Sequence, residues 1–302
     1  MRLVWLLALA VLGSACSTQQ WIVRSIKEAE LELHAHGGFA LYDPGRQKYL
    51  IEHQSDRYFT PASNTKIFTF YAALKILGDS AIALRYSQRG DSLIIWGAGD
   101  PSFLYPHAYS NTKTYSFLQN HSGKLFLSTT NYKTLPLGPG WAWDDYLYSY
   151  STERTPLPIY GNLITIRKDS TEFSIQPRKF VEHFTVASEA HSSEEIIRDV
   201  DGNQLTYFPG KSSGGEWSVP FRYSSDLVAE LLSDTLHRPV EEIQWPLPGG
   251  ANELTSVPLD SLYRVMMQDS DNFIAEQLLL QCAAVLSDTL NPDLAIEYVI
   301  KN

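Results

Sequence analysis

Two short polar motifs, far apart in the sequence, contain the residue types that can turn a serine into a nucleophile. Ser63 and Lys66 are three positions apart, so on a helix they lie one turn apart on the same face. A serine hydroxyl reacts well only when a base takes its proton, and a lysine whose amine is kept neutral by burial can be that base. The second motif, Ser270-Asp271-Asn272, supplies another hydroxyl and an amide. These residues are our candidates for a serine-nucleophile site.

The tetrapeptide Ser-x-x-Lys is a weak signal alone, and the sequence repeats it at Ser110-Asn111-Thr112-Lys113. The segments behind the two copies differ. Lys66 is followed by apolar residues at helical spacing and then by Gly78: Ile67, Phe70, Tyr71, Leu74 and Leu77. This spacing predicts a helix with one apolar stripe, whereas no comparable pattern follows Lys113, and we interpret the second copy as a polar loop. Ser270 also has a structural alternative, as the N-cap of a following helix.

The two motifs together are the signature of penicillin-binding proteins and class A β-lactamases. Further short motifs occur in a fixed order: Pro-Ala-Ser-Asn-Thr-Lys at 61–66, Gly-Asp-Pro at 99–101, Gly-Trp-Ala-Trp-Asp-Asp at 140–145, Val-Pro-Leu at 257–259 and Asp-Ser-Asp-Asn at 269–272. From about Gly38 to its end, the chain therefore resembles the class C low-molecular-mass penicillin-binding proteins. These are the D-alanyl-D-alanine carboxypeptidase/endopeptidases of the penicillin-binding protein 4 type.

The resemblance implies roles for the four candidate residues. Ser63 would attack the penultimate D-alanine carbonyl of a peptidoglycan stem peptide, and Lys66 would accept its proton. Ser270 would relay a proton to the leaving amine, and Asn272 would orient Lys66 and the substrate amide. The implied partners are peptides ending in D-Ala-D-Ala, with β-lactams as inhibitors that acylate Ser63. The family implies no metal and no organic cofactor.

The family's third motif, Lys-Thr-Gly, does not occur in the sequence. The similar Lys211-Ser212-Ser213-Gly214 precedes Ser270, which is the wrong order. We therefore expect the C-terminal part of the catalytic sheet to be missing from this chain. Two alternatives stay open: a non-catalytic or impaired peptidoglycan- or penicillin-binding remnant, and a β-lactamase, which the long stretch between the two serines disfavours.

The first residues have the pattern of an export signal. Met1-Arg2 precedes a short apolar run and then Gly13-Ser14-Ala15-Cys16, which resembles a bacterial lipoprotein processing site. We expect export to the periplasm, with Cys16 carrying a lipid that anchors the chain to a membrane. Gly13 departs from the branched aliphatic residue usual at such sites, and cleavage after Ala15 without lipidation is the alternative.

Length and composition bound the architecture. With 302 residues the chain exceeds the usual size of a single domain. The net charge of −10 argues against a nucleic-acid partner and against a basic membrane-surface patch. We expect an α/β (α+β) fold with a transpeptidase domain like that of penicillin-binding proteins and serine β-lactamases. The predicted parts are a signal peptide at 1–15, the catalytic domain at 16–96 and 246–302, and a mostly β inserted domain at 97–245.

Local patterns predict several elements. Strands 39–42 and 49–51 flank a turn at 43–45, a strand at 92–96 follows a turn at 90–91, and strands 163–166 and 173–175 form a further pair. Helices are expected from Ser225, over 259–267 and from Phe273 onward. Cys282 lies in an apolar stretch and is expected to be a buried small hydrophobe. Tyr160-Gly161-Asn162, which imitates a β-lactamase motif, is interpreted as a coincidence.

Overall fold

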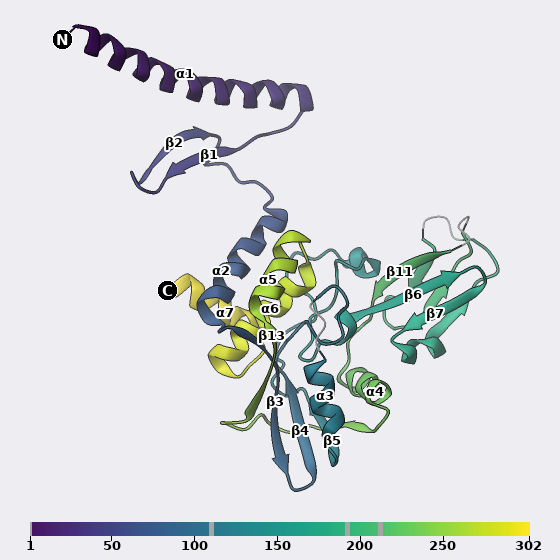
Figure 1. Cartoon of the computed structure of the whole chain (residues 1–302). Helices are drawn as coiled ribbons and strands as arrows, with labels where there is room; N and C mark the ends of the chain where they lie inside the picture. The colour runs from purple at the N-terminus through teal and green to yellow at the C-terminus, as the bar shows by residue number, and fades with distance from the viewer. Residues whose placement is uncertain (1, 109–111, 191–193, 211–213) are drawn as a thin grey trace. The chain divides into compact units, whose positions relative to one another are not determined.

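A computed structural model describes the backbone of residues 2–108, 112–190, 194–210 and 214–302, with side chains from Thr18 onward. The chain divides into two compact units, residues 1–62 and 63–302 (Figure 1). Most of the sheets and the four candidate residues of the serine-nucleophile site belong to the second unit.

The first unit consists of a helix and a hairpin. Helix α1 (Arg2–Leu33) is followed by strands β1 (Phe39–Asp43) and β2 (Lys48–His53), which pair antiparallel with Leu41 opposite Ile51. The Asp43 carboxylate accepts hydrogen bonds from the backbone N–H groups of Gly45 and Arg46 and so closes the turn. The predicted hairpin is confirmed. Across the described part of the chain, no helix is both long and apolar enough to cross a membrane.

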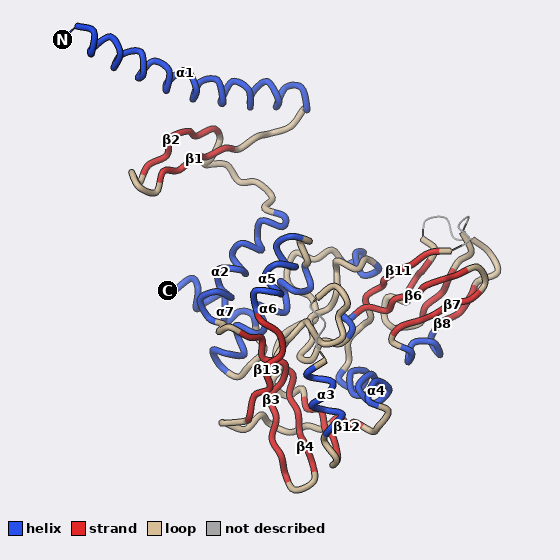
Figure 2. The backbone as a smooth tube through the Cα atoms, viewed as in Figure 1, coloured by secondary structure: helices blue, strands red, loops and turns tan. Residues whose placement is uncertain are grey.

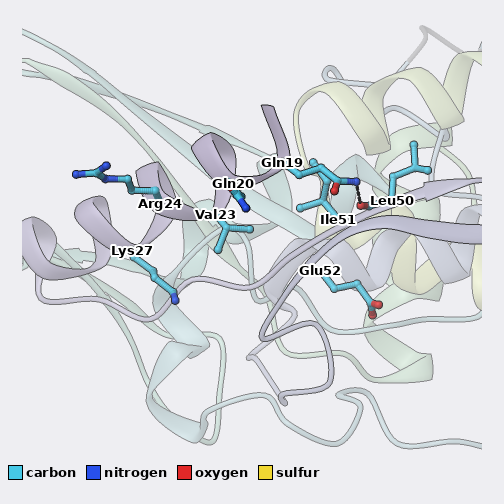
Figure 3. Close-up of a pocket in the computed structure, with 8 residues that line it drawn as sticks. All are labelled: Gln19, Gln20, Val23, Arg24, Lys27, Leu50, Ile51 and Glu52. Atoms are coloured by element: carbon cyan, nitrogen blue, oxygen red, sulfur yellow. Dashed lines mark hydrogen bonds between the residues drawn. The ribbon is translucent and has the colours of Figure 1, made fainter. Parts of the chain in front are cut away.

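Polar contacts tie α1 to the hairpin. The Glu30 carboxylate accepts from Gly37 N–H at 2.7 Å and from Gln54 Nε2 at 2.7 Å, and it lies 3.2 Å from His53 Nε2. Closer to the start of α1, the Gln19 amide donates to the Leu50 carbonyl (Figure 3). Side chains of α1 and β2 also line an open cavity of about 480 Å³: Gln19, Gln20, Val23, Arg24, Lys27, Leu50, Ile51 and Glu52.

A five-stranded mixed sheet organises the second unit (Figure 2). Its order is β12 (Val240–Glu242), β5 (Lys124–Ser128), β4 (Ser92–Gly97), β3 (Ser80–Arg89) and β13 (Asn252–Pro258). The central strand β4 is a continuous buried apolar run from Leu93 to Trp96, as expected for a strand covered on both faces. The predicted strand at 92–96 and its turn are confirmed. Strands from both sides of the predicted domain boundary at residues 96–97 belong to this one sheet. The limits of the two predicted domains stay a prediction.

Two small sheets account for most of the β structure between residues 163 and 220. One has the order β11 (Gly215–Pro220), β6 (Leu163–Asp169), β7 (Glu172–Gln176). The predicted pairing of 163–166 with 173–175 is confirmed, with Ile166 opposite Ile175. The other has the order β8 (Phe184–Val186), β10 (Leu205–Tyr207), β9 (Ile196–Arg198). The predicted helix is α4 (Ser225–Leu236), which begins where Ser224 Oγ accepts from Leu227 N–H at 3.1 Å.

The expectation of a polar loop at the second copy of Ser-x-x-Lys is wrong for its last residue, Lys113. Lys113 is the first residue of helix α3 (Lys113–Asn120), which buries Thr114 and Leu118. Tyr115 and Phe117 pack against the same core. The apolar residues begin only two positions after Lys113, and the polar residues between them make the helical spacing hard to see in the sequence. Ser110 and Asn111, and likewise Lys211, Ser212 and Ser213, lie outside the described residues.

Four helices form a cluster beside the sheet: α2 (Lys66–Ile76), α5 (Leu259–Gln268), α6 (Asn272–Ser287) and α7 (Pro292–Lys301) (Figure 1). A single-turn 3₁₀ helix (Ala62–Thr65) precedes α2. Helix α6 is the most buried of the four and carries Cys282, which is a buried free thiol as predicted. In α5, Leu262 and Met266 are buried but Met267 is exposed.

The predicted helix behind Ser63 exists, but its apolar stripe is only partly buried, with Phe70 and Leu77 packed against the core. Ile67, Tyr71 and Leu74 are exposed, whereas Lys66, Ala72 and Ala73 are buried. Helix α2 packs against α5, α6 and α7, and small alanines on the packed face let helix backbones come close together. The spacing of the large side chains therefore predicted the helix correctly, but only part of the apolar stripe lies on the packed face.

Candidate active site

Ser63 and Lys66 meet at the junction between the 3₁₀ turn and α2. Lys66 Nζ lies 3.2 Å from Ser63 Oγ, within hydrogen-bond distance. Ser63 is exposed, and Lys66 is only 6% exposed. The preceding residue, Ala62, has a φ of 46°, in the left-handed region that a residue with a Cβ seldom adopts. An accessible hydroxyl therefore stands beside a buried amine, the arrangement needed for a nucleophile and its base.

The Ser-Asp-Asn motif forms the short connection between α5 and α6 and brings a second hydroxyl to Ser63. Ser270 Oγ donates to Ser63 Oγ at 2.7 Å. The N-cap of α6 is Asp271, whose carboxylate accepts from Ile274 N–H at 2.8 Å, so the alternative of Ser270 as the cap is wrong. Ser270 itself has a φ of 57°, a left-handed conformation of the kind that typically costs about 1–3 kcal/mol and clusters at functional sites.

Asn272 is held at both ends of its amide. Its Oδ1 accepts a hydrogen bond from Lys66 Nζ, and its Nδ2 donates to the Tyr150 carbonyl oxygen at 3.1 Å. Because the two ends have opposite hydrogen-bonding character, these partners fix which end faces Lys66. Asn272 therefore connects the base to the segment that passes Tyr150.

The environment of Lys66 favours the neutral amine. Burial lowers the pKa of Lys66 below its ordinary value, and the nearby carboxylates of Asp271 and Glu276 oppose that shift. The net direction is downward. A larger share of the amine is thus unprotonated near neutral pH than in an exposed lysine, as a general base requires.

A cavity of about 330 Å³ opens beside the motif. It is lined by Ser270 and Asn272 with nine other residues: Tyr105, His107, Ser149, Tyr150, Leu163, Ser218, Asp269, Asp271 and Phe273. Tyr105 donates to the second oxygen of Asp271 at 2.8 Å. Burial and the Asp271 charge raise the pKa of Tyr105, so its hydroxyl stays protonated and keeps this bond. The cavity is large enough to admit part of a small peptide.

The structure brings the four candidate residues together, and their catalytic roles stay predictions. The sequence missed several of their neighbours, Tyr105, Tyr150, Arg154 and Glu276, and it gave Trp141 only as part of a family motif. Glu276 had a readable signal, because it follows Asn272 by four positions on a helix. Tyr150 had none, because it contributes a backbone carbonyl.

The other motifs singled out in the sequence have different partners. Lys113 Nζ donates to Thr255 Oγ1 on β13 at 2.9 Å. The Asn162 side chain is fully buried and bonded locally, to the Ile159 N–H, the Glu153 carbonyl and the Thr155 hydroxyl. Among the residues that the structure describes, no group of three or more His, Cys, Asp or Glu side chains is placed to hold a metal ion.

Comparison with known proteins decides the family. The family model described as "D-Ala-D-Ala carboxypeptidase 3 (S13) family" matches residues 20–299. The chain belongs to this family. The resemblance noted from the sequence motifs is thereby confirmed at the level of the family. No curated protein matches the chain.

Solved structures support the same fold. The crystal structure of penicillin-binding protein 4 from Haemophilus influenzae matches with a TM-score of 0.66 and 20% identity, over 87% of this chain and 67% of that chain. A second structure of that protein, in complex with a β-lactam, matches with a TM-score of 0.59 and 19% identity, over 88% of this chain and 67% of that chain. The mixed α+β fold of this S13 chain is therefore that of penicillin-binding protein 4.

Proposed function

We propose that this S13 chain is a serine D-alanyl-D-alanine carboxypeptidase/endopeptidase that acts on peptidoglycan stem peptides through an acyl-enzyme on Ser63. The observation that carries the proposal is the convergence of Lys66 Nζ and Ser270 Oγ on one exposed hydroxyl, at 3.2 Å and 2.7 Å. A base and a second hydroxyl on the same nucleophile are the parts that acyl transfer needs.

The proposed reaction has two steps. Ser63 Oγ attacks the carbonyl carbon of the penultimate D-alanine, and its proton passes to Lys66 Nζ. The C–N bond to the terminal D-alanine then breaks, and Ser270 gives its proton to the leaving amine while the proton held by Lys66 replaces it, which leaves an ester on Ser63. A water molecule hydrolyses this ester. The Ser63 N–H, at the start of a helix, is available to the oxyanion.

β-Lactams enter the proposal through the same serine. Their strained amide imitates the D-Ala-D-Ala end of the substrate, and ring opening by Ser63 would leave a covalent adduct. The neighbour from H. influenzae has been crystallised with a β-lactam, which supports penicillins as probes for this chain.

A second candidate function is an impaired peptidoglycan- or penicillin-binding protein. A β-lactamase is the third candidate.

Release of D-alanine from a blocked tripeptide that ends in D-Ala-D-Ala separates these functions. We expect release by the purified chain and none by Ser63→Ala. No release together with a stable penicillin adduct would favour the impaired binder. Penicillin turnover much faster than D-alanine release would favour a β-lactamase. Equal release by the two chains would contradict the proposed role of Ser63.

A further inference from the structure

Glu276 lies one helical turn after Asn272 on α6, so the two side chains share a face of the helix. Its two carboxylate oxygens have separate partners. Oε1 accepts from Trp141 Nε1 at 3.2 Å, and Oε2 accepts from Arg154 Nη1 at 3.3 Å. The carboxylate therefore bridges two residues that lie at opposite ends of the segment 141–154.

Arg154 makes this bridge hard to replace. Its side chain is 6% exposed, against 24% for Glu276. Its Nη2 donates to the Leu135 carbonyl at 2.9 Å and to Thr134 Oγ1 at 3.3 Å, while its backbone N–H donates to the Pro136 carbonyl at 2.7 Å. Glu276 supplies the carboxylate in this arrangement. Removing one member of a buried ion pair leaves the other charge uncompensated, which is strongly unfavourable.

The bridged segment reaches the candidate site between its two ends. Tyr150 lies in it, and the Tyr150 carbonyl accepts the hydrogen bond from Asn272 Nδ2. Helix α6 therefore holds the segment at three points, through Glu276 twice and through Asn272 once. The orientation of the Asn272 amide, which faces Lys66 with its oxygen, depends on where this segment lies.

Glu276 also faces Lys66 across a small cavity. The cavity has a volume of about 120 Å³ and is lined by Lys66 and Glu276 with Thr65, Thr69, Trp141, Asn272, Ala275 and Leu279. Two acidic groups act on Lys66, Asp271 and Glu276, both on or at the start of α6. Arg154 is the charged partner on the other side of Glu276.

We propose that Glu276 is a positioning residue for acylation of Ser63: its carboxylate fixes the segment 141–154 against α6 and sets the charge that faces Lys66. The inference rests on the proposed serine chemistry. It adds a residue that touches neither substrate nor nucleophile but acts through Asn272 and Lys66.

The two parts of this role have different kinetic signatures. If Lys66 must be neutral to accept the Ser63 proton, the acylation rate rises with pH through the pKa of Lys66 and then levels off. The negative charge of Glu276 raises that pKa, so its removal lowers the pKa and moves the rising limb to lower pH. Loss of the anchor for the segment lowers the limiting rate instead, because the partners of Lys66 are held less firmly.

Glu276→Gln separates the two signatures, since it removes the charge but keeps an oxygen for Trp141. We expect the rising limb of the pH profile for labelled-penicillin acylation to move to lower pH by about 1 unit, the lower end of the range for a nearby charge. The limiting rate should fall by roughly tenfold. Glu253→Gln is the matched control, because Glu253 pairs with the buried Arg85 at 3.1 Å on the sheet. That control should leave the pH profile unchanged.

Trp141→Phe tests the anchor alone, since it removes the Nε1 donor and keeps the charge of Glu276. We expect the limiting acylation rate to fall while the rate still rises at the same pH as in the wild type. Trp141→Phe also tests the role of Glu276 if Glu276→Gln does not fold. An unmoved limb in a folded Glu276→Gln chain, or wild-type acylation by Trp141→Phe, would overturn the inference. No acylation of the wild-type chain would instead contradict the proposed function itself.

Discussion

Replacing Lys66 by alanine should slow the acylation of Ser63 by a labelled penicillin by about 10²–10⁴-fold, the usual loss when a general base is removed. The Lys66 amine is 3.2 Å from Ser63 Oγ, and burial shifts its pKa toward the neutral form. The fold should survive, because the change removes a buried amine whose burial is itself unfavourable. The second-order rate constant of acylation is the quantity to measure, on protein whose circular dichroism matches that of the wild type.

Lys113→Ala is the matched control for this prediction. Lys113 ends the second Ser-x-x-Lys copy and also begins a helix, but its amine bonds to Thr255 on β13. Its replacement should leave the acylation rate at the wild-type value. Full-rate labelling of Lys66→Ala, or an equal loss in both variants, would remove Lys66 from its assigned role.

Replacing Asn272 by aspartate should slow acylation at neutral pH by about 10- to 1000-fold. The substitution keeps the shape of the side chain and places a carboxylate where Oδ1 now accepts from Lys66 Nζ. An opposite charge at this range typically raises the pKa of a lysine by about 1–3 units, and each unit removes about nine-tenths of the neutral amine. The new carboxylate would also face the Tyr150 carbonyl without a proton to donate.

The pH dependence of the Asn272→Asp variant distinguishes this electrostatic effect from simple disruption. If charge is the cause, raising the pH restores much of the rate, because Lys66 then loses its extra proton. The pH at which the acylation rate rises should be higher than in the wild type for this variant and lower for Glu276→Gln. A rate that stays low at every pH, or a limb that does not move, would show that the charge near Lys66 does not control the reaction.

The sequence was most informative where function depends on neighbouring side chains. Ser63 and Lys66 are separated by one helical turn, and Ser270 and Asn272 flank a cap residue, so each pair is prearranged by local structure. The hairpin β1–β2, the pair β6–β7 and helix α4 likewise follow from turn residues, alternation and caps. Local rules of this kind can be read from a few adjacent residues.

Local rules of this kind could not predict which distant strands pair in the five-stranded sheet. Strand β5 pairs in parallel with both β4 and β12, and β12 lies more than a hundred positions further along the chain. Nothing in the short run Val240–Glu242 indicates which strand it pairs with. Parallel strands are joined by long connections, so no hairpin turn in the sequence identifies the partner. In the structure, strands on both sides of the predicted limits of the insert lie in one sheet, and the limits themselves stay a prediction.

The buried face of α2 and the carbonyl of Tyr150 were missed for two further reasons. The packed face of α2 includes Ala72, Ala73 and Phe70. A pattern based on large apolar side chains does not show that Ala72 and Ala73 are buried while Ile67 and Leu74 are exposed. Tyr150 accepts the hydrogen bond from Asn272 through its backbone carbonyl, so the residue type at position 150 does not indicate this contact. In both cases the contact depends on the helix that packs against the segment and not on the local sequence.

The most direct test of the account is the position of the penicillin adduct. We predict that incubation of the purified chain with a labelled penicillin, followed by proteolysis and mass spectrometry, gives one modified residue, Ser63. Ser63→Ala should carry no label, and Ser110→Ala, which changes the serine of the second Ser-x-x-Lys copy, should be labelled like the wild type. Label on any other residue, or label that persists in Ser63→Ala, would contradict the assignment of Ser63 as the nucleophile.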